Sequence, residues 1–474
     1  MSETPPDVLE RPLVAIANRL PISRVDGAWK TSAGGLVTAL KPIMERVDGA
    51  WVGWDGGHED VPPRAEGLDI DLLPIPLTHA ELQGFYYGFS NRTLWPLFHD
   101  LLEQPIFDRG WWNAYRQVNE RFAERTRDVD FPGRQPPLLW VQDYHLMLLP
   151  ALLRERGSEG PIAFFLHIPF PPPELFARLP WRRRIIEGLL GADVVGFHTA
   201  RYRDNFIRSA ERLSAVEGVE DGAVLLRDGR RVAAVAHPIS VDAGEFARLA
   251  QSDEVNTELA SLRQQFAGRK VLLGVDRLDY TKGIHERLKA IERLLERRSD
   301  LRNRITFVQI AVPSREGVRE YRELRRDVER EVGRINGRFT EPGGEVPVYY
   351  LHRGVPRHRL VAYYRLADVA VVTPLKDGMN LIAKEFVVCQ HAGDGAGALV
   401  LSEYTGAALE LDGAVQCNPF DVEGLSHRIE MAIELDEEER RKRLARMAGH
   451  VRANDVFAWV EDQLGEVARA FQGA

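Results

Sequence analysis

The sequence predicts an α/β protein built from two doubly wound parallel sheets with helices on both faces. Short apolar runs rich in β-forming residues alternate with longer amphipathic segments along the chain. Nine such runs are too many for one ordinary doubly wound sheet, and an eightfold barrel is the competing topology. A polar stretch at residues 251–269 interrupts the alternation before a new strand begins at Val271, and this boundary favours two sheets.

The predicted strands share a continuous apolar character, as expected of strands that are buried on both faces. They occupy residues 13–17, 138–141, 162–166, 194–197, 271–275, 305–311, 348–351, 369–373 and 399–401. Helices fill the intervals, and the segment 285–297 places Leu288, Ile291 and Leu295 on one helical face. A last helix over 456–471 follows the second domain, and we expect it to cross back onto the first.

Composition excludes several classes of protein. Of 474 residues 44 % are apolar, which is enough for full-sized cores. Acidic residues outnumber basic ones, 70 to 62, so a net charge of −8 argues against binding nucleic acid or a membrane surface. Two cysteines form neither a disulfide framework nor a structural zinc site. We expect no secretory signal, no membrane span and a cytoplasmic location; self-association into a homo-oligomer stays open.

Polar residues follow two predicted strands of the first half directly. Asp143 and His145 follow one, and His167 follows the next. Carboxylate and imidazole groups next to a buried strand are costly unless they have partners or a function. Taken alone, Asp143 is better explained as the N-cap of a helix over 145–156, and His145 fits equally well as a structural histidine. Polar residues at two successive strand ends favour a site.

A double glycine, Gly34-Gly35, comes after the first strand and opens a predicted helix. Such a pair lets backbone N–H groups approach an anion at the helix N-terminus. Taken alone, the pair is better explained by a tight turn that needs positive φ. It does not match the G-x-G-x-x-G dinucleotide fingerprint.

The second half carries two comparable segments at strand ends. Arg277 and Lys282 lie five residues apart across a turn, so both can converge on one diphosphate. The other segment follows the strand at 369–373, where Gly378 permits close backbone approach. Its carboxylates, Asp377 and Glu385, suit sugar and ribose hydroxyls, although an ordinary capped helix start is the alternative.

Metal chemistry has little support in the sequence. The D-x-D strings Asp69–Asp71 and Asp128–Asp130 are predicted to lie in polar loops, and no metal-ligand or nucleophile-elbow motif is present. What remains is an anion-binding cleft with arginine, lysine and glycine-rich helix starts and no evident nucleophile. That set suits the transfer of a group away from a phosphate.

Taken jointly and in order, these motifs resemble the trehalose-6-phosphate synthases, a family of retaining glycosyltransferases. The resemblance implies the GT-B fold, in which two Rossmann-like domains face each other across a cleft. It extends over nearly the whole chain. The matching segments are Asn18-Arg19, Ser32-Ala33-Gly34-Gly35-Leu36, Tyr86-Tyr87, Ser90-Asn91, Leu94-Trp95-Pro96, Asp143-Tyr144-His145, Phe164-Phe165-Leu166-His167-Ile168-Pro169-Phe170, Arg277-Leu278-Asp279-Tyr280-Thr281-Lys282, Arg334-Ile335-Asn336-Gly337 and Asp377-Gly378-Met379-Asn380.

The resemblance also implies a division of labour between the domains. Residues 1–240, with the terminal helix 456–474, would bind the acceptor, and residues 241–455 would bind the nucleotide sugar. The implied acceptor-binding residues are Arg19, Tyr87, Trp95, Asp143 and Arg315. The implied donor-binding residues are Gly34, Gly35, Val355, Asp377, Gly378, Met379, Asn380, Leu381, Ile382, Ala383, Lys384 and Glu385, and the implied catalytic residues are His167, Arg277, Lys282 and Asp143.

The implied reaction moves glucose from UDP-glucose or GDP-glucose to glucose 6-phosphate, giving α,α-trehalose 6-phosphate in trehalose biosynthesis. It needs no metal and no cofactor, and its only implied partners are these small molecules. The side chain at Val355 varies in the family, so the donor base stays open. A pseudo-glycosyltransferase acting on cyclitols, a non-catalytic sensor of trehalose metabolites and a pyridoxal-phosphate phosphorylase are the alternatives.

Overall fold

The computed structural model describes residues 11–25, 28–31, 37, 40, 44, 48–58, 60–65, 68–102, 105–213, 216–220 and 222–472. The chain forms two compact units. Unit 1 comprises Met1–Ile239 with Phe457–Ala474, and unit 2 comprises Ser240–Val456. The chain therefore leaves unit 1 after Ile239 and returns to it after Val456.

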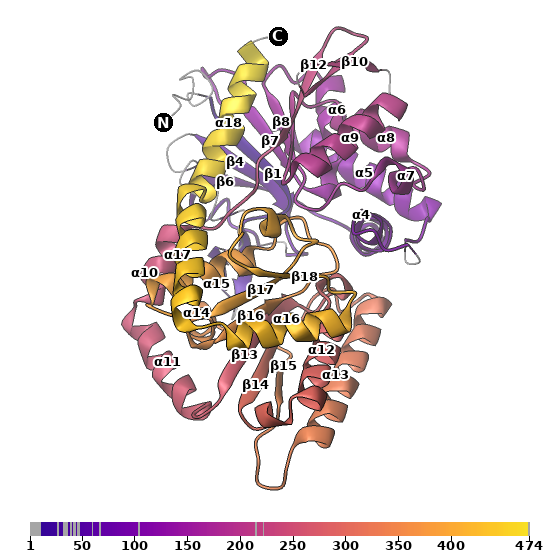
Figure 1. Ribbon diagram of the computed structural model, residues 1–474. Coiled ribbons are helices and arrows are strands. Elements are labelled where there is room, and N and C mark those ends of the chain that lie inside the picture. Colours follow the sequence, from indigo (N-terminus) through magenta and orange to yellow (C-terminus); the bar gives the residue numbers. More distant parts are fainter. Residues whose placement is uncertain are drawn as a thin grey trace. The chain divides into compact units, whose positions relative to one another are not determined.

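In the described part of unit 1, a 10-stranded sheet lies in the order β10-β11-β12-β9-β8-β7-β1-β4-β6-β5 (Figure 1). Its strands are β1 (Leu13–Arg19), β4 (Gly49–Trp54), β5 (Arg64–Ala65), β6 (Leu68–Ile75), β7 (Leu138–Gln142), β8 (Ile162–Phe165), β9 (Val194–Phe197), β10 (Val216–Glu220), β11 (Ala223–Leu226) and β12 (Arg231–Ala236). The β10–β11, β11–β12 and β5–β6 pairs are antiparallel. All the other neighbouring strands in this order pair in parallel. A separate hairpin joins β2 (Ile22–Val25) and β3 (Ala28–Thr31).

The described helical segments of unit 1 connect these strands. They are α3 (His79–Glu81), the π-helical η1 (Leu82–Leu94), α4 (Trp95–Phe98), α5 (Arg109–Thr126), the 3₁₀ turn η2 (Tyr144–Leu146), α6 (Leu149–Glu155), α7 (Pro173–Phe176), α8 (Arg182–Leu189), α9 (Ala200–Leu213) and α18 (Val456–Gln472). The helical run from His79 begins with a capping box in which Thr78 and Glu81 satisfy each other's backbone N–H groups.

The C-terminal helix α18 packs on the sheet of unit 1. Trp459 stacks on Trp140 of β7 with ring centroids 5.5 Å apart. Nε2 of Gln463 lies 2.7 Å from Nδ1 of His237, which follows β12. The prediction that the last helix crosses back onto the first domain is therefore confirmed.

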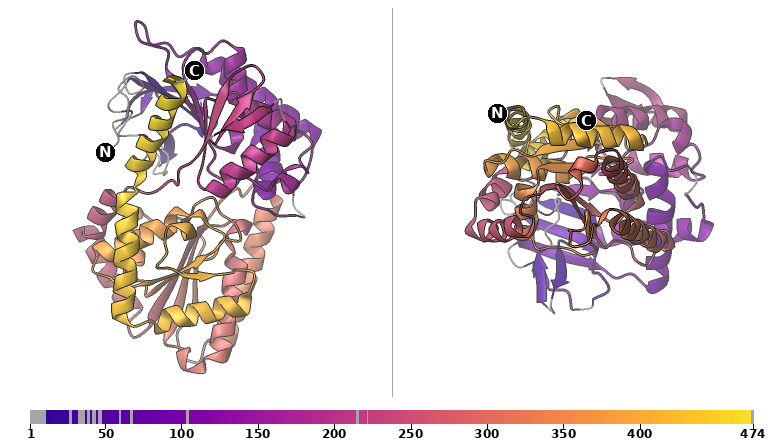
Figure 2. Two further views of the ribbon diagram at one scale, coloured as in Figure 1. Left: turned by 45° about the horizontal axis from the view of Figure 1, so that its top comes forward. Right: turned by 60° about the horizontal axis from the view of Figure 1, so that its bottom comes forward.

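Unit 2 contains a 6-stranded, fully parallel sheet in the order β15-β14-β13-β16-β17-β18, with helices on both faces (Figure 2). Its strands are β13 (Lys270–Arg277), β14 (Ile305–Val312), β15 (Val348–Leu351), β16 (Val369–Val372), β17 (Ala398–Ser402) and β18 (Val415–Cys417). Its helical segments are α10 (Ala243–Ala250), α11 (Asp253–Gln265), η3 (Tyr280–Lys282), α12 (Ile284–Arg297), η4 (Ser299–Leu301), α13 (Arg319–Phe339), α14 (Arg357–Leu366), α15 (Leu381–Ala392), η5 (Gly406–Leu409), α16 (Val422–Glu434) and α17 (Glu437–Ala453).

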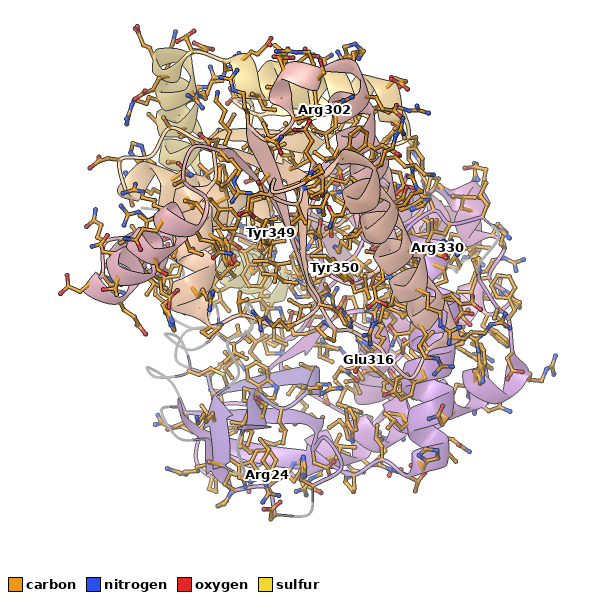
Figure 3. All side chains as sticks on the ribbon, turned by 90° about the horizontal axis from the view of Figure 1, so that it is seen from below. Arg24, Arg302, Glu316, Arg330, Tyr349 and Tyr350 are labelled. Atoms are coloured by element: carbon orange, nitrogen blue, oxygen red, sulfur yellow. The ribbon has the colours of Figure 1, made fainter. Side chains whose placement is uncertain are left out.

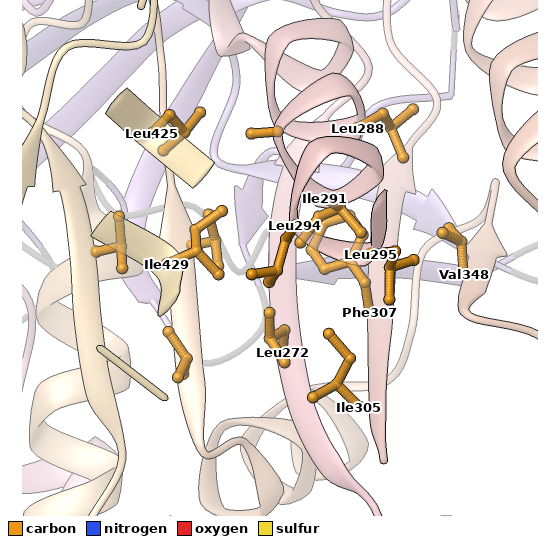
Figure 4. Packing of buried hydrophobic residues seen from close by; sticks show 14 of the residues in the cluster. Leu272, Leu288, Ile291, Leu294, Leu295, Ile305, Phe307, Val348, Leu425 and Ile429 are labelled. Carbon is orange, nitrogen blue, oxygen red and sulfur yellow. The ribbon is translucent and has the colours of Figure 1, made fainter. Parts of the chain in front are cut away.

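The core of unit 2 forms where α12 and α16 lie on the sheet (Figure 4). The apolar face of α12 contributes Leu288 and Ile291, which belong to one buried cluster with Leu272 of β13 and Phe307 of β14. Each of these side chains is at most 1 % exposed. Burial of a leucine or isoleucine of this kind stabilises a fold by about 1.5–3 kcal/mol. The core thus fixes the strands whose carboxyl ends carry the predicted donor residues.

All nine predicted strands are present, with ends that differ by at most two residues. Two local predictions are wrong. The segment 145–156 is a 3₁₀ turn followed by the shorter α6, not one helix. Asp69 and Asp71 lie in β6 and not in a loop, and Asp71 pairs with Arg64 of β5 at 3.0 Å. Their strand was missed because the alternating aspartates hide an apolar residue at every second position.

Candidate active site

Three neighbouring strands of unit 1 end in predicted site residues. β1 pairs with β7 and β7 pairs with β8, all in parallel. Parallel strands have their carboxyl ends at the same edge, where open α/β sheets bind ligands. Arg19 is the last residue of β1, Asp143 follows β7, and His167 lies two residues beyond β8. The fold therefore brings these three residues to one edge of unit 1.

Asp143 links two of these strand ends. Its Oδ1 accepts a hydrogen bond from the backbone N–H of His167 at 3.1 Å, and its side chain makes no capping bond to η2. The helix-cap interpretation of Asp143 is therefore wrong. Its φ of +72° is a strained conformation of the kind found at functional sites. His145 is 7 % exposed and stacks on Tyr86 with centroids 5.9 Å apart, as a structural histidine would.

His167 is an uncharged hydrogen-bonding group. Its Nε2 lies 2.9 Å from Oε1 of Gln142, so a proton on Nε2 is donated to that amide oxygen. Burial lowers the pKa of His167 to about 3, so the imidazole is neutral near pH 7. The neutral ring keeps Nδ1 as an acceptor for a sugar hydroxyl. His167 is thus suited to orienting a sugar and not to acting as a general acid.

Aromatic rings surround the predicted acceptor-binding residues of unit 1. The guanidinium carbon of Arg19 lies 4.6 Å from the ring centroid of Trp54 and 5.7 Å from that of Tyr86. Such stacking orients the guanidinium while its edge N–H groups can still donate to an anion. Tyr87 is half-buried and meets Tyr86 edge-on at 5.2 Å. Trp95 is 4 % exposed, so most of its ring packs inside unit 1.

The glycine pair predicted to bind the donor, Gly34 and Gly35, lies outside the described residues.

In unit 2 two cations flank the turn after β13. Arg277, the last residue of β13, is exposed, whereas Lys282 at the end of η3 is 8 % exposed. The Lys282 ammonium donates to the Asp377 carboxylate at 2.6 Å. Asp377 follows β16, which is paired with β13. The ion pair therefore joins two adjacent strand ends at the edge where open α/β sheets bind ligands.

The segment after β16 prepares the start of α15. Asn380 has a φ of +89° and caps the helix, because its Oδ1 accepts the Ala383 N–H at 3.2 Å. The first turn of α15 thus presents backbone N–H groups and the positive end of the helix dipole. A Cβ on Gly406 would lie 2.3 Å from the carbonyl oxygen of Gly378, so the segment packs closely. Among the other predicted donor-binding residues here, Met379 is buried and Leu381 and Ile382 are half-buried.

Two charged residues of α15 have different surroundings. Lys384 is fully buried and pairs with Glu410 at 2.8 Å, so only its backbone is left to contact a ligand. Burial also lowers the pKa of Lys384. Glu385 is half-buried, and its Oε2 accepts a hydrogen bond from the Tyr364 hydroxyl at 2.7 Å. Burial raises the pKa of Glu385 to about 7.

Arg315 and Val355 come from the loops after β14 and β15. The side chain of Arg315 is 4 % exposed, and its Nη1 donates to Asp279 at 3.0 Å. Arg315 does not belong to the charged helix that follows it, because α13 begins only at Arg319. Val355 is half-buried and precedes α14.

Three buried residues that hold the strand-end residues of unit 1 or of unit 2 have no predicted role of their own. Asp279 and Arg287 are both 0 % exposed, and Gln142 is 1 % exposed. Each lies in, or within ten residues of, a strand end that carries a predicted site residue. In the sequence, each of them is recognisable only as a polar residue within a segment that must be buried. The sequence does not show which residue it bonds.

Within the described ranges, no group of three or more His, Cys, Asp or Glu residues is arranged to hold a metal ion. No helix in the same ranges is long and apolar enough to cross a bilayer.

A sequence profile of glycosyltransferase family 20 matches residues 11–469. The chain belongs to glycosyltransferase family 20. This family-20 enzyme is 47 % identical over 477 residues to the trehalose-6-phosphate synthase of Mycolicibacterium paratuberculosis, with 96 % of this chain and 95 % of the relative covered. Its identity to the trehalose-6-phosphate synthase of Mycobacterium bovis is 46 % over 479 residues, with 96 % and 94 % covered.

Solved structures resemble the family-20 chain over almost its whole length. An E. coli structure bound with UDP-2-fluoro glucose aligns with a TM-score of 0.88 and 34 % identity, covering 97 % of this chain and 99 % of that one. An α,α-trehalose-phosphate synthase (UDP-forming) from Burkholderia xenovorans in complex with glucose-6-phosphate aligns with a TM-score of 0.86 and 35 % identity, covering 95 % and 98 %. The predicted GT-B fold class and the prediction of a glycosyltransferase are confirmed.

Proposed function

We propose that this family-20 enzyme transfers glucose from UDP-glucose to glucose 6-phosphate with retention, releasing UDP and α,α-trehalose 6-phosphate. The observation that carries the proposal is the Lys282–Asp377 ion pair beside the capped start of α15. A buried cation and a helix N-terminus at adjacent strand ends suit a sugar-linked diphosphate. The choice of UDP rests on the relatives, one UDP-forming and one bound with UDP-2-fluoro glucose.

Unit 2 would bind the donor. Arg277 and Lys282 would neutralise the diphosphate, whose negative charge increases as the bond to glucose breaks. The first turn of α15 would donate backbone hydrogen bonds, and the half-buried carboxylate of Glu385 would accept hydrogen bonds from ribose hydroxyls. Asp377 would bind glucose hydroxyls, and Val355 would contact the base through its backbone.

The acceptor and the transferred sugar would be recognised by groups of complementary chemistry. Arg19 and Arg315 would donate to the phosphate of glucose 6-phosphate, because a phosphate monoester carries close to two negative charges near pH 7. Tyr87 and the edge of Trp95 would contact its ring. Asp143 would accept a hydrogen bond from an acceptor hydroxyl.

The chemistry requires no protein nucleophile. The bond between C1 of glucose and the diphosphate oxygen breaks, and the acceptor hydroxyl oxygen forms the new bond to C1 from the same face. The acceptor proton passes to an oxygen of the departing diphosphate. Neutral His167 would orient the transferred glucose through Nδ1 and carry no proton in the step. Because the substrates are phosphorylated and charged, they do not cross membranes unaided, which favours a cytoplasmic reaction.

The test is to incubate the purified protein with glucose 6-phosphate and UDP-glucose or GDP-glucose in separate reactions. Released nucleoside diphosphate is measured, and NMR couplings at both anomeric carbons give the configuration of the product. We expect turnover that depends on glucose 6-phosphate and an α,α product. Turnover with GDP-glucose alone would overturn the donor assignment. Binding without turnover would favour the sensor, and coupling to an amino-cyclitol in place of the sugar would favour the pseudo-glycosyltransferase.

A further inference from the structure

The carboxylate of Asp279 divides its two oxygens between two parts of the site in unit 2. Oδ1 accepts hydrogen bonds from the backbone N–H of Thr281 at 3.0 Å and from its hydroxyl at 2.9 Å. Oδ2 accepts from Nη1 of Arg315 at 3.0 Å and from the hydroxyl of Tyr321 at 2.8 Å. Asp279 itself is 0 % exposed.

Each oxygen is therefore connected to a different residue that is predicted to bind substrate: Oδ1 to Lys282 through the turn η3, and Oδ2 directly to Arg315. Through Oδ1, Asp279 caps η3, the turn that ends in Lys282. Through Oδ2, it holds Arg315, whose φ of +48° is an uncommon conformation for a residue with a side chain. Tyr321, from the first turn of α13, completes the arrangement, because its hydroxyl also contacts Arg315.

Stability alone does not account for this arrangement. Burying an ion pair costs desolvation of both charges, and an apolar replacement of the pair is often as stable. The ion pair with Asp279 does, however, hold the guanidinium of Arg315 in one geometry, and Arg315 is a predicted acceptor-binding residue. The hydroxyl of Tyr321 touches both charged partners, while its ring packs on Tyr280 with centroids 5.1 Å apart.

We propose that Asp279 and Tyr321 are positioning residues for the acceptor, and that Asp279 couples acceptor recognition to the turn that carries Lys282. Arg315 touches the acceptor phosphate, and Tyr321 and Asp279 act only through Arg315 and η3. The inference rests on the proposed function, in which Arg315 binds the phosphate of glucose 6-phosphate. It adds one physical connection between the acceptor phosphate and the cation that stabilises the leaving group.

The test uses Tyr321→Phe, which removes one hydroxyl and keeps the ring that packs on Tyr280. We expect KM for glucose 6-phosphate to rise about 2- to 10-fold, the value of one hydrogen bond. The preference for glucose 6-phosphate over glucose should fall by the same factor. The dissociation constant for UDP, measured by calorimetry, should not change. A merely structural role for the hydroxyl would lower the melting temperature without changing the preference between acceptors.

Tyr349→Phe is the matched control. Tyr349 lies on β15 (Figure 3), and its hydroxyl also bonds a carboxylate, Oε2 of Glu345 at 2.6 Å. Removing this hydroxyl should leave the KM for glucose 6-phosphate and the KM for UDP-glucose unchanged. Asp279→Asn retains the shape of the side chain but removes its charge, so it should raise KM for glucose 6-phosphate and lower kcat together.

The outcomes separate this inference from the proposed function. If the wild type uses glucose 6-phosphate but Tyr321→Phe leaves its KM and the acceptor preference unchanged, the positioning role is overturned alone. If Asp279→Asn raises KM without lowering kcat, the coupling to Lys282 is overturned. If the wild type has no turnover with glucose 6-phosphate and any nucleotide glucose, the proposed function fails and the inference with it.

Discussion

The ammonium of Lys282 and the carboxylate of Asp377 form a 2.6 Å ion pair between the ends of two adjacent strands of unit 2. Only 10 % and 15 % of the two side chains are exposed, and Asn380 donates a second hydrogen bond to the same carboxylate oxygen at 3.1 Å. Asp377 thus fixes the position of the ammonium that we propose binds the diphosphate. A preorganised cation needs no reorganisation when charge develops on the leaving group.

Replacing Arg277 or Lys282, the two cations at the turn after β13, should slow the chemical step. We expect Lys282→Ala and Arg277→Ala each to lower kcat by about 10²–10³-fold, as for the loss of one electrostatic stabiliser of a transition state. Steady-state kinetics with both substrates varied gives the result. Lys270→Ala is the control, because Lys270 lies at the other end of β13 and donates to the carbonyl of Ile433. A change confined to KM for glucose 6-phosphate would show that the cations do not serve the leaving group.

Arg315 should determine the preference for a phosphorylated acceptor. Hydrogen bonds to charged groups contribute about 1.5–3 kcal/mol each. We therefore expect Arg315→Ala to lower kcat/KM for glucose 6-phosphate by roughly 10–150-fold, with little change in donor binding. The ratio of kcat/KM for glucose 6-phosphate to that for glucose is the readout and should shrink. Arg319→Ala, which removes an exposed arginine paired with Glu323, is the control. An intact preference in Arg315→Ala would place the phosphate contact elsewhere.

Donor binding should depend on pH through Glu385. Burial raises the pKa of this carboxyl to about 7, while Tyr364 and Arg357 oppose the rise. Below pH 7 the group is protonated and accepts hydroxyl hydrogen bonds less well. We expect KM for UDP-glucose to fall as pH rises from 6 to 8 and this dependence to be lost in Glu385→Gln. A pH profile of KM that is the same in both proteins would contradict the assignment.

The same group affects stability with a definite sign. Between pH 4.5, the ordinary pKa of glutamate, and about 7, the folded protein holds a proton that the unfolded chain has lost. The contribution of Glu385 to the free energy of unfolding is therefore largest below pH 4.5, and it decreases as pH rises to 7. Urea midpoints of the wild type measured across this window should fall relative to those of Glu385→Gln.

Arg287 should be essential for the stability of unit 2. It is fully buried and donates to Asp276 at 2.6 Å, to Gln309 at 2.8 Å, to Thr373 at 3.0 Å and to the Lys282 carbonyl at 3.3 Å. Arg287→Met leaves the Asp276 carboxylate buried without this partner, which costs about 3–5 kcal/mol. We expect a lower urea midpoint and a lower kcat.

The double variant Arg287→Met/Asp276→Leu should recover part of this stability, because it leaves no unpaired charge. It should not recover kcat, because the Lys282 carbonyl still lacks its donor. Arg269→Met is the matched control. The side chain of Arg269 is 6 % exposed and bonds Thr306 at the opposite end of the sheet, so its loss should lower stability without lowering kcat. An unchanged midpoint in Arg287→Met would contradict the prediction.

Strands that consist of a continuous apolar run could be predicted from the local sequence. Strands of other composition could not. β4 is fully buried, yet two of its six residues are glycines and two are tryptophans. Gly53 is required there, because a Cβ would lie 2.5 Å from the backbone carbonyl carbon of Arg19. In a sequence, glycine at such a position indicates a turn, and the close approach of a second strand is not visible.

The sequence by itself determined where polar residues follow buried strands. Because parallel strands end on the same side of a sheet, it thereby predicted that Asp143 and His167 share one edge of unit 1, and the structure adds Arg19 at the end of β1. Only the tertiary structure decided which partner each polar group has. Asp143 bonds a backbone N–H 24 residues away, and Lys282 bonds a carboxylate 95 residues away. Such pairings depend on which strands become neighbours and on how deeply each charge is buried, and neither is encoded within a local stretch of chain.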